Sequence, residues 1–459
     1  MTRYQTFNPI DTLFYVYDQA VRRVGLPGSY IQNHMRMAGR VDVAGLRRAI
    51  AVIHRAYPAT AGRLERDAIT GRPRWRLDVA RPDADPLLHI HPLRPATEEE
   101  LERQTHLMLA TPIELDRPPM QFHLFRGLPE GDVLMMRWPH FFMDVSGVGF
   151  LVDDLRAAYD AQTDPNEQDS KQDERRTDFA DLVANISPWE KARMLSRLSE
   201  DGPPPGWRDA MLPDQPIARP YGKIRYLIRV FDDDQTRRVH ETASRMCGFA
   251  RYAAFLRASA IRAMHRVMPH ALRPNQGYST LSMIDYRRRR THGPVCHNHF
   301  GGVPAYVPAE LVEDRKAVAL MLDRTTRRAR KDGRVLRTQV ANDLLSKLPT
   351  SMMIEALADS LRPGFTSSLP LGFGKQPSIQ VGFMTLFRER DQFFCGTKLK
   401  RVYGFGLPPL HTGFAVDVNL SLGRLHMSVT YIESRVSAET VRAFIDDFAA
   451  ALTDPADHR

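Results

Sequence analysis

The chain has 459 residues, of which 43% are hydrophobic, and a formal net charge of +10. This length exceeds one ordinary hydrophobic core, so we expect two domains of about 200 residues each. The sequence has no run of about 18 apolar residues that could span a membrane, and its polar start lacks the apolar core of a signal peptide. No nucleic-acid recognition motif accompanies the positive charge. Anionic partners of other kinds are equally consistent with the charge, namely coenzyme A phosphates, an acidic carrier protein or an anionic membrane surface.

The three cysteines, Cys247, Cys296 and Cys395, are widely spaced and form neither a CxxC pair nor a metal-binding pattern. This spacing indicates a reducing, cytoplasmic setting, and we expect all three thiols to take no part in chemistry. His297 and His299 lack a third ligand at suitable spacing, so no metal site is expected.

The first half of the sequence alternates helices and strands, which indicates an α/β or α+β domain. Residues 10–24 predict an amphipathic helix, and Asp42 caps a second one with a buried stripe that includes Leu46 and Ile50. Thr97 and Glu100 form a capping-box signature for a third helix. Strands are predicted at 30–37, at 74–79, at 87–91 and from residue 120.

The second half follows a polar surface segment at 161–175 and a predicted helix from 179 to about 198. The Gly- and Pro-rich residues 199–221 are the best connection between domains. Helices are predicted at 234–246, 251–268, 314–330 and 337–360, and after Ser437. Strands are predicted at 223–231, 278–285, 378–387, 413–420 and 425–432, with a further apolar run after Gly301-Gly302.

The stretch 132–161 organises the rest of the chain. Val133 to Trp138 reads as a buried strand, and helical spacing begins at Val145, so His140 and Asp144 lie on a strand-to-helix turn. A histidine can take a proton from a hydroxyl or an amine and return it. Taken alone, His140 could also be a core histidine, and Asp144 a helix cap.

The sequence PHFFMDVSGVGFL resembles the HHxxxDG motif of the chloramphenicol acetyltransferase-like superfamily, which includes condensation domains and wax ester synthase/diacylglycerol acyltransferases. Residues 396–432 are similar to the C-terminal hairpin region of the wax ester synthase branch, which is the branch that the chain resembles most. Pro139 replaces the first histidine of the motif, and Val145 replaces its usual glycine, with Gly147 following closely.

The resemblance implies a fold of mixed α/β sheets in two acetyltransferase-like domains, arranged as a pseudo-dimeric V with the active-site tunnel between them. The first domain would span 1–198, the linker 199–221, and the second domain 222–459. It also implies that His140 is the catalytic base and that Asp144 is a structural, orienting residue.

Further site residues are implied by resemblance in the second half. Asp285-Tyr286-Arg287 looks like the DxR segment of the superfamily, and Asn298 looks like its Gly-Asn position, with His297 in place of the glycine. We expect the Asp144 carboxylate to pair with Arg287, because a buried carboxylate needs a partner. In the wax ester synthase branch a Ser-Asn pair often precedes the C-terminal region, and its equivalent here, Val381 to Thr385, contains no asparagine. Thr385 or a backbone N–H would therefore have to supply the oxyanion donor.

The predicted function is acyl transfer from a thioester, acyl-CoA or an acyl-carrier protein, to an alcohol or amine acceptor, which can be a small molecule or a lipid. No cofactor is bound permanently, and peripheral membrane contact remains open. Two alternatives remain open: a condensation enzyme that depends on a carrier protein, and a binding module of the same fold that has lost its chemistry.

Overall fold

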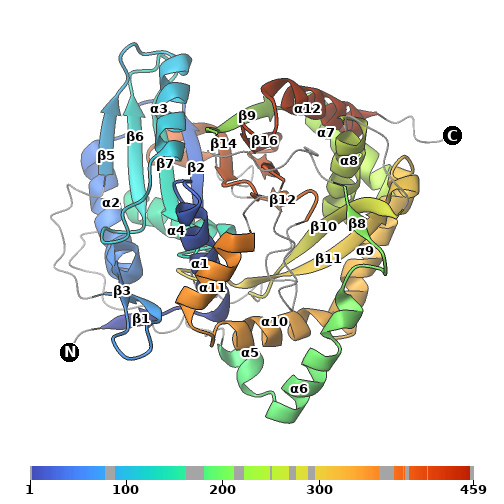
Figure 1. Cartoon of the computed structure of the whole chain (residues 1–459). Helices are drawn as coiled ribbons and strands as arrows, with labels where there is room; N and C mark the ends of the chain where they lie inside the picture. The colour runs from blue at the N-terminus through green and yellow to red at the C-terminus, as the bar shows by residue number, and fades with distance from the viewer. Residues whose placement is uncertain are drawn as a thin grey trace.

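The computed structural model describes residues 3–77, 88–161, 180–210, 222–248, 251–267, 275–287, 295–360, 377–385, 387, 392–410 and 412–454. The mixed α/β architecture predicted from the sequence is confirmed, with curled mixed sheets in two lobes (Figure 1). Within the described residues, no helix is both long enough and apolar enough to cross a bilayer.

A six-stranded sheet forms the centre of the first lobe. Its strands, in spatial order, are β13 (Phe393–Phe394), β14 (Thr397–Gly406), β2 (Tyr30–Met37), β7 (Val133–Pro139), β6 (Gln121–Arg126) and β5 (Leu88–Pro92). Its largest core lies against α1 (Pro9–Arg23), α2 (Val43–Ala56), α4 (Val145–Asp160) and α11 (Thr350–Ser360). Helix α3 (Glu98–Ala110) packs with a smaller core that includes Phe125 and Met135.

The second lobe contains a four-stranded sheet of β12 (Val381–Met384), β15 (Phe414–Ser421), β16 (Arg424–Ile432) and β9 (Ile224–Val230). One face packs on a core shared with α7 (Asp233–Cys247), α8 (Tyr252–Val267), α9 (Arg315–Lys331) and α12 (Ala438–Thr453). Beside it lies a small sheet of β11 (Phe300–Pro308), β10 (Gln276–Asp285) and β8 (Arg208–Asp209). A second small sheet joins β1 (Tyr4–Thr6), β4 (Pro73–Arg76) and β3 (Arg63–Arg66) near the N-terminus.

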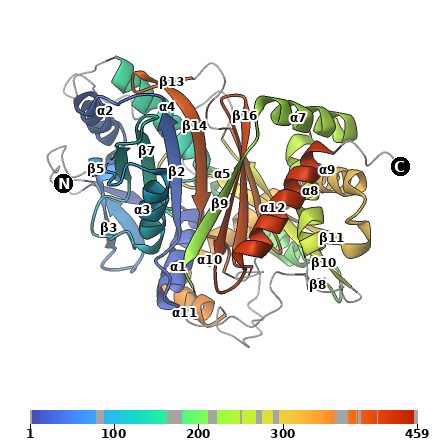
Figure 2. The same cartoon turned by 90° about the horizontal axis from the view of Figure 1, so that it is seen from above.

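Strand β14 joins the two lobes. It comes late in the sequence but pairs antiparallel with β2, from His34 opposite Tyr403 to Ile31 opposite Gly406. Figure 2 shows β14 between β2 and β16, where the two larger sheets approach each other. The sequence analysis did not predict this strand. Although β14 follows the predicted domain boundaries at 198 and 222 in the sequence, it belongs to the six-stranded sheet of the first lobe.

Local signals account for most helix boundaries. Asp42, Thr97 and Ser437 cap their helices as predicted, and Leu46 and Ile50 are buried on α2. Two predicted helices were wrong because a proline interrupts each of them. The helix predicted from 179 is α5 (Ala180–Ala184) and then α6 (Pro188–Ser196), which begins afresh at a Ser187 capping box.

The helix predicted at 337–360 is likewise two helices, α10 (Arg334–Leu345) and α11, with Pro349 immediately before the second. A proline lacks the backbone N–H that would continue the first helix. The predicted surface segment 161–175 lies, after residue 161, outside the described residues.

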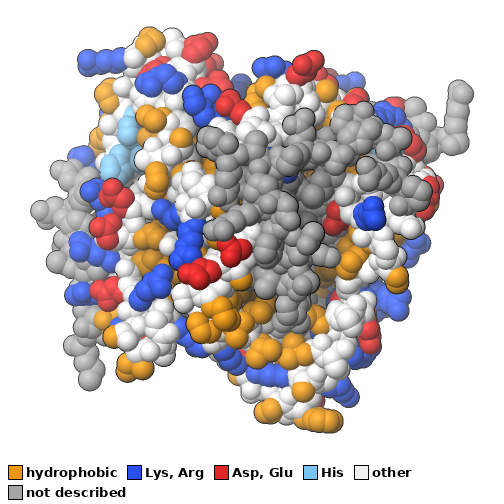
Figure 3. All heavy atoms as spheres, viewed as in Figure 1, with side chains coloured by type: hydrophobic (Ala, Val, Ile, Leu, Met, Phe, Trp, Pro, Cys, Tyr) orange, Lys and Arg blue, Asp and Glu red, His pale blue; other side chains and the backbone are white. Residues whose placement is uncertain are grey.

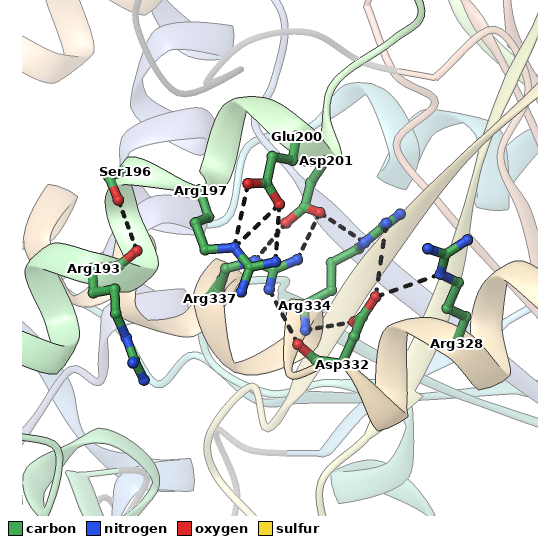
Figure 4. Close-up of polar contacts among 9 residues, drawn as sticks. All are labelled: Arg193, Ser196, Arg197, Glu200, Asp201, Arg328, Asp332, Arg334 and Arg337. Carbon is green, nitrogen blue, oxygen red and sulfur yellow. Dashed lines mark hydrogen bonds and ion pairs between the residues drawn. The ribbon is translucent and has the colours of Figure 1, made fainter.

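The start of the predicted connection is fixed by an ion-pair cluster (Figure 4). Asp201 ends the 3₁₀ helix Leu198–Asp201 and accepts hydrogen bonds from Arg337 Nε at 2.9 Å and Nη2 at 2.8 Å. Arg334 Nε lies 2.8 Å from the same carboxylate. Because Asp201 is buried, these contacts hold the segment after α6 against α10.

Candidate active site

The turn between β7 and α4 is held in place on both sides. All seven residues of β7 are buried, and Phe141, Phe142 and Met143 are fully buried in the turn. His140 N donates to Ser29 O at 2.9 Å, and Trp138 Nε1 donates to Met143 O at 2.9 Å. The turn therefore presents His140 from a rigid frame.

The His140 imidazole is half-buried and stacks on Phe14 of α1, with ring centroids 4.0 Å apart and planes 17° apart. Burial lowers the pKa of His140 from its usual value of 6.5, and this is opposed by its own backbone carbonyl, Asp144 and the Asn298 side chain. Nδ1 is buried, so Nε2 is the ring nitrogen that a substrate can approach. The ring is therefore neutral near pH 7 and able to accept a proton.

Asp144 both caps α4 and pairs with Arg287, so the two roles weighed in the sequence are combined. Its Oδ1 accepts from Gly147 N at 2.8 Å. Its Oδ2 accepts from Arg287 Nη1 at 2.9 Å and from His299 N at 2.7 Å. The predicted Asp144–Arg287 contact is confirmed, and the two side chains are only 6% and 2% exposed. This carboxylate fastens the His140 turn to the second half of the chain.

Asp285 and Arg287 form a bracket at the end of β10. Asp285 Oδ1 accepts from the Arg287 backbone N at 2.9 Å and from Nη1 at 3.2 Å. Arg287 Nη2 donates to His297 O at 3.1 Å. The arginine thus joins Asp144, Asp285 and the segment before β11, which is a positioning role with no substrate contact required.

Gly147 allows α4 to approach this same segment closely. A Cβ at this position would collide with Val295 O and with the Met143 side chain. The glycine is therefore required for packing, and its N–H completes the cap on Asp144.

Asn298 connects His140 to Asp11 of α1. Its Nδ2 donates to His140 O at 2.8 Å and to Asp11 Oδ1 at 2.9 Å, and its backbone N donates to Asp11 Oδ1 at 2.8 Å. The other Asp11 oxygen lies 2.5 Å from His297 Nδ1. His297 stands where the resemblance expects a glycine, and its side chain contacts Asp11.

Asp11 and Phe14 were not identified from the sequence. They lie three residues apart on one face of α1, where Asp11 reaches the backbone carbonyl of His140 through Asn298 and Phe14 covers its ring. The available signal was the capping box of Asn8 and Asp11. That signal marks the start of a helix but does not reveal a contact with residue 298.

The cysteine thiols are buried, and burial raises the pKa of each of them. A raised pKa disfavours the thiolate that nucleophilic attack would need. Thr385, which the sequence offered as an oxyanion donor, lies exposed directly after β12.

No family model and no curated protein sequence matches the chain. Solved structures do match nearly all of it. The first condensation domain of the CDA synthetase matches with a TM-score of 0.66 and 15% identity, over 99% of this chain and 97% of that chain.

Two further matches share the same architecture. The TRI3 trichothecene 15-O-acetyltransferase from Fusarium sporotrichioides matches with a TM-score of 0.66 and 10% identity, over 98% of this chain and 95% of that one. The epimerization domain from the third module of tyrocidine synthetase B gives 0.62 and 15%, over 99% and 96%.

The chain has the two-lobed fold of condensation domains and chloramphenicol acetyltransferase-like acyltransferases. At these identities the likeness establishes the fold, and the chemistry has to be argued from the residues of the site.

Proposed function

We propose that the chain is an acyltransferase that moves an acyl group from a thioester to an alcohol or amine by direct attack. The observation that carries the proposal is the His140 imidazole, which is half-buried and held where the two halves of the chain meet, and burial lowers its pKa from the usual 6.5. A base with this environment can take the proton from the acceptor directly, so no nucleophilic serine or cysteine of the protein is required.

In the proposed reaction, His140 Nε2 takes the proton from the acceptor hydroxyl or amine as its oxygen or nitrogen attacks the thioester carbonyl. The tetrahedral intermediate collapses with cleavage of the carbon–sulfur bond. The leaving thiolate then receives the proton from His140, which restores the neutral ring. Asp144, Arg287, Asp285, Asn298 and Gly147 position the turn and do not exchange protons with substrate.

The donor is proposed to be acyl-CoA, with an acyl-carrier protein as the alternative. Condensation domains among the structural neighbours support the second choice, as does the net charge of +10, which favours an acidic partner. We place the chain nearest to the wax ester synthase branch on the resemblance of residues 396–432.

Peripheral membrane contact is proposed for the surface formed by α10 and α11. Figure 3 shows hydrophobic side chains gathered over these helices, and Leu344, Leu348 and Met352 are each more than a third exposed. Exposed apolar side chains of this kind suit a lipid-bearing acceptor or a membrane surface.

Thiol release is the experiment that tests the proposed function. The purified chain is mixed with acyl-CoA of increasing chain length, or with a loaded carrier protein, with and without alcohol and amine acceptors. An acyl-CoA-dependent transferase releases thiol from acyl-CoA only when an acceptor is present, and a carrier-dependent enzyme does so only from the loaded carrier. No acceptor-dependent release from any donor would contradict the proposal and favour a binding module.

A further inference from the structure

One face of the four-stranded sheet is polar where it turns away from its helices. On β15 and β16 the side chains alternate, so Phe414, Val416 and Val418 enter the core with α8 and α12, and the next residues face the opposite way. We call this opposite face the inner wall and define it by Asp417, Asn419, His426, Ser428 and Thr430. Asp417 lies opposite Ser428 in the register, and Asn419 lies opposite His426.

The inner wall faces the first lobe. Ser428 Oγ donates to Gly404 O of β14 at 2.6 Å. Tyr226 of β9, opposite Thr430, stacks on Phe405 of β14 with centroids 4.3 Å apart. Figure 2 shows α7, α8 and α12 on the far side of this sheet from β14 and β2. The wall and the His140 turn therefore both lie where the two lobes meet.

Polar atoms of the inner wall lack partners within the described ranges. They are Asn419 Nδ2, His426 Nδ1 and Thr430 Oγ1, on side chains that are 3%, 1% and 0% exposed. Buried polar groups are nearly always hydrogen-bonded in folded proteins, to protein, water or ligand. These three atoms have no accessible surface and mark the tightly packed part of the wall, whereas Asp417 is the wall residue that keeps accessible surface.

The surroundings of Asp417 indicate a bound cation and not ordered water alone. It is half-buried, and its carboxylate has no ion pair or hydrogen bond with the residues the structure describes. Burial raises the pKa of Asp417 to about 7. Water can satisfy a neutral amide or hydroxyl, but a desolvated carboxylate is stabilised by a cation. The chain carries 64 lysines and arginines, yet within the described residues none of them is paired with Asp417.

Gly382 of β12 makes room for this carboxylate. It lies opposite Asp417 in the parallel register, and a Cβ at residue 382 would collide with Asp417 Oδ1. The carboxylate therefore extends over the bare backbone of β12, and Asp417 remains only half-buried there.

We infer that Asp417 binds a primary ammonium group as its counter-ion, where the inner wall meets β12. Together with the proposed function, this makes the acyl acceptor a molecule that is anchored at Asp417 by an ammonium group and presents a separate hydroxyl or amine to His140 Nε2. The binding site itself does not depend on the proposed function, because it is argued from the wall alone.

The test measures binding by calorimetry in the His140→Ala background, where no turnover is needed. The probes are hexylamine and 2-phenylethylamine, each compared with the alcohol of the same shape. We expect Asp417→Asn to weaken amine binding at least about tenfold, the usual worth of a hydrogen bond to a charged group, and alcohol binding less than about threefold. Asp446→Asn, on the exposed outer side of α12, changes the net charge equally and should change neither.

A second variant moves the carboxylate without removing it. Gly382→Ala should displace Asp417 and weaken amine binding at unchanged net charge. If neither amine binds more tightly to the Asp417 protein than to Asp417→Asn, the inference is overturned. If amine binding depends on Asp417 but no thiol release is found with any donor, the inference stands and the proposed acyl transfer fails.

Discussion

Asp144 and Asp417 are both carboxylates set against the junction of the two lobes, but their surroundings are opposite. Asp144 accepts hydrogen bonds from Gly147 N, His299 N and Arg287 Nη1. Asp417 has no such partner among the described residues, and its pKa is raised to about 7. A fully partnered carboxylate fixes a structure, whereas an unpartnered one is available to a ligand. The comparison separates the part of the site that positions His140 from the part that is proposed to bind a ligand.

The largest expected effect comes from breaking the partnered carboxylate. Asp144→Asn and Arg287→Ala should each lower the free energy of unfolding by about 3–5 kcal/mol, because removing one partner leaves the other charge buried. Acyl transfer should fall with it, since the His140 turn loses its tie to β10. Chemical denaturation together with thiol release checks this, and variants that keep wild-type stability would show that the pair contributes nothing.

The unpartnered carboxylate should respond with the opposite sign. Asp417→Asn should raise the free energy of unfolding at pH 8 by about 1–3 kcal/mol, the usual cost of a desolvated group without partners. The folded pKa of Asp417, about 7, lies above its usual 3.8, so the wild type gains stability as the pH falls through this window. The advantage of the asparagine variant should therefore shrink between pH 8 and pH 5. If the asparagine variant is no more stable than the wild type at pH 8, the Asp417 carboxylate is already stabilised by a partner.

A smaller effect is expected from the link between α1 and His140. Asp11→Asn should lower kcat about tenfold with little change in KM, because Asn298 loses the carboxylate that orients it towards the carbonyl of His140. The matched control is Asp18→Asn, also buried on α1 but paired with Arg22. The control should lose stability without a change in kcat for the folded protein, and equal kcat losses in both variants would leave Asp11 with a purely structural role.

The smallest expected effect is a shift of the pH profile. Because burial lowers the pKa of His140 below 6.5, the base form persists below that pH. The acid limb of kcat/KM should therefore lie below pH 6.5. Removing the Asp144 charge, which raises the pKa of His140, should move the limb lower still. An acid limb above pH 6.5 in the wild type would show that substrate-free His140 is not desolvated.

The sequence predicted the positioning part of the site better than the receiving part. Asp144 and Arg287 lie in short motifs that carry the resemblance, and a buried carboxylate needs a partner. The contact of Asp11 with Asn298 joins residues that are far apart in the chain, and a capping box indicates only the start of a helix. The inner wall was also not identified, because alternation along β15 and β16 predicts two faces but not which face lacks a cover. Strand β14 was missed for a related reason, since its partner β2 lies in the other half of the chain.

Single-turnover thiol release by wild type and His140→Ala tests the central claim most directly. With donor and acceptor both saturating, we predict that the variant keeps the wild-type unfolding transition and releases thiol about 10²–10⁴-fold more slowly, the usual contribution of a general base. His89→Ala, on the exposed edge strand β5, is the matched control and should keep the wild-type rate. A folded His140→Ala protein that releases thiol at the wild-type rate would contradict the assignment of His140 as the base.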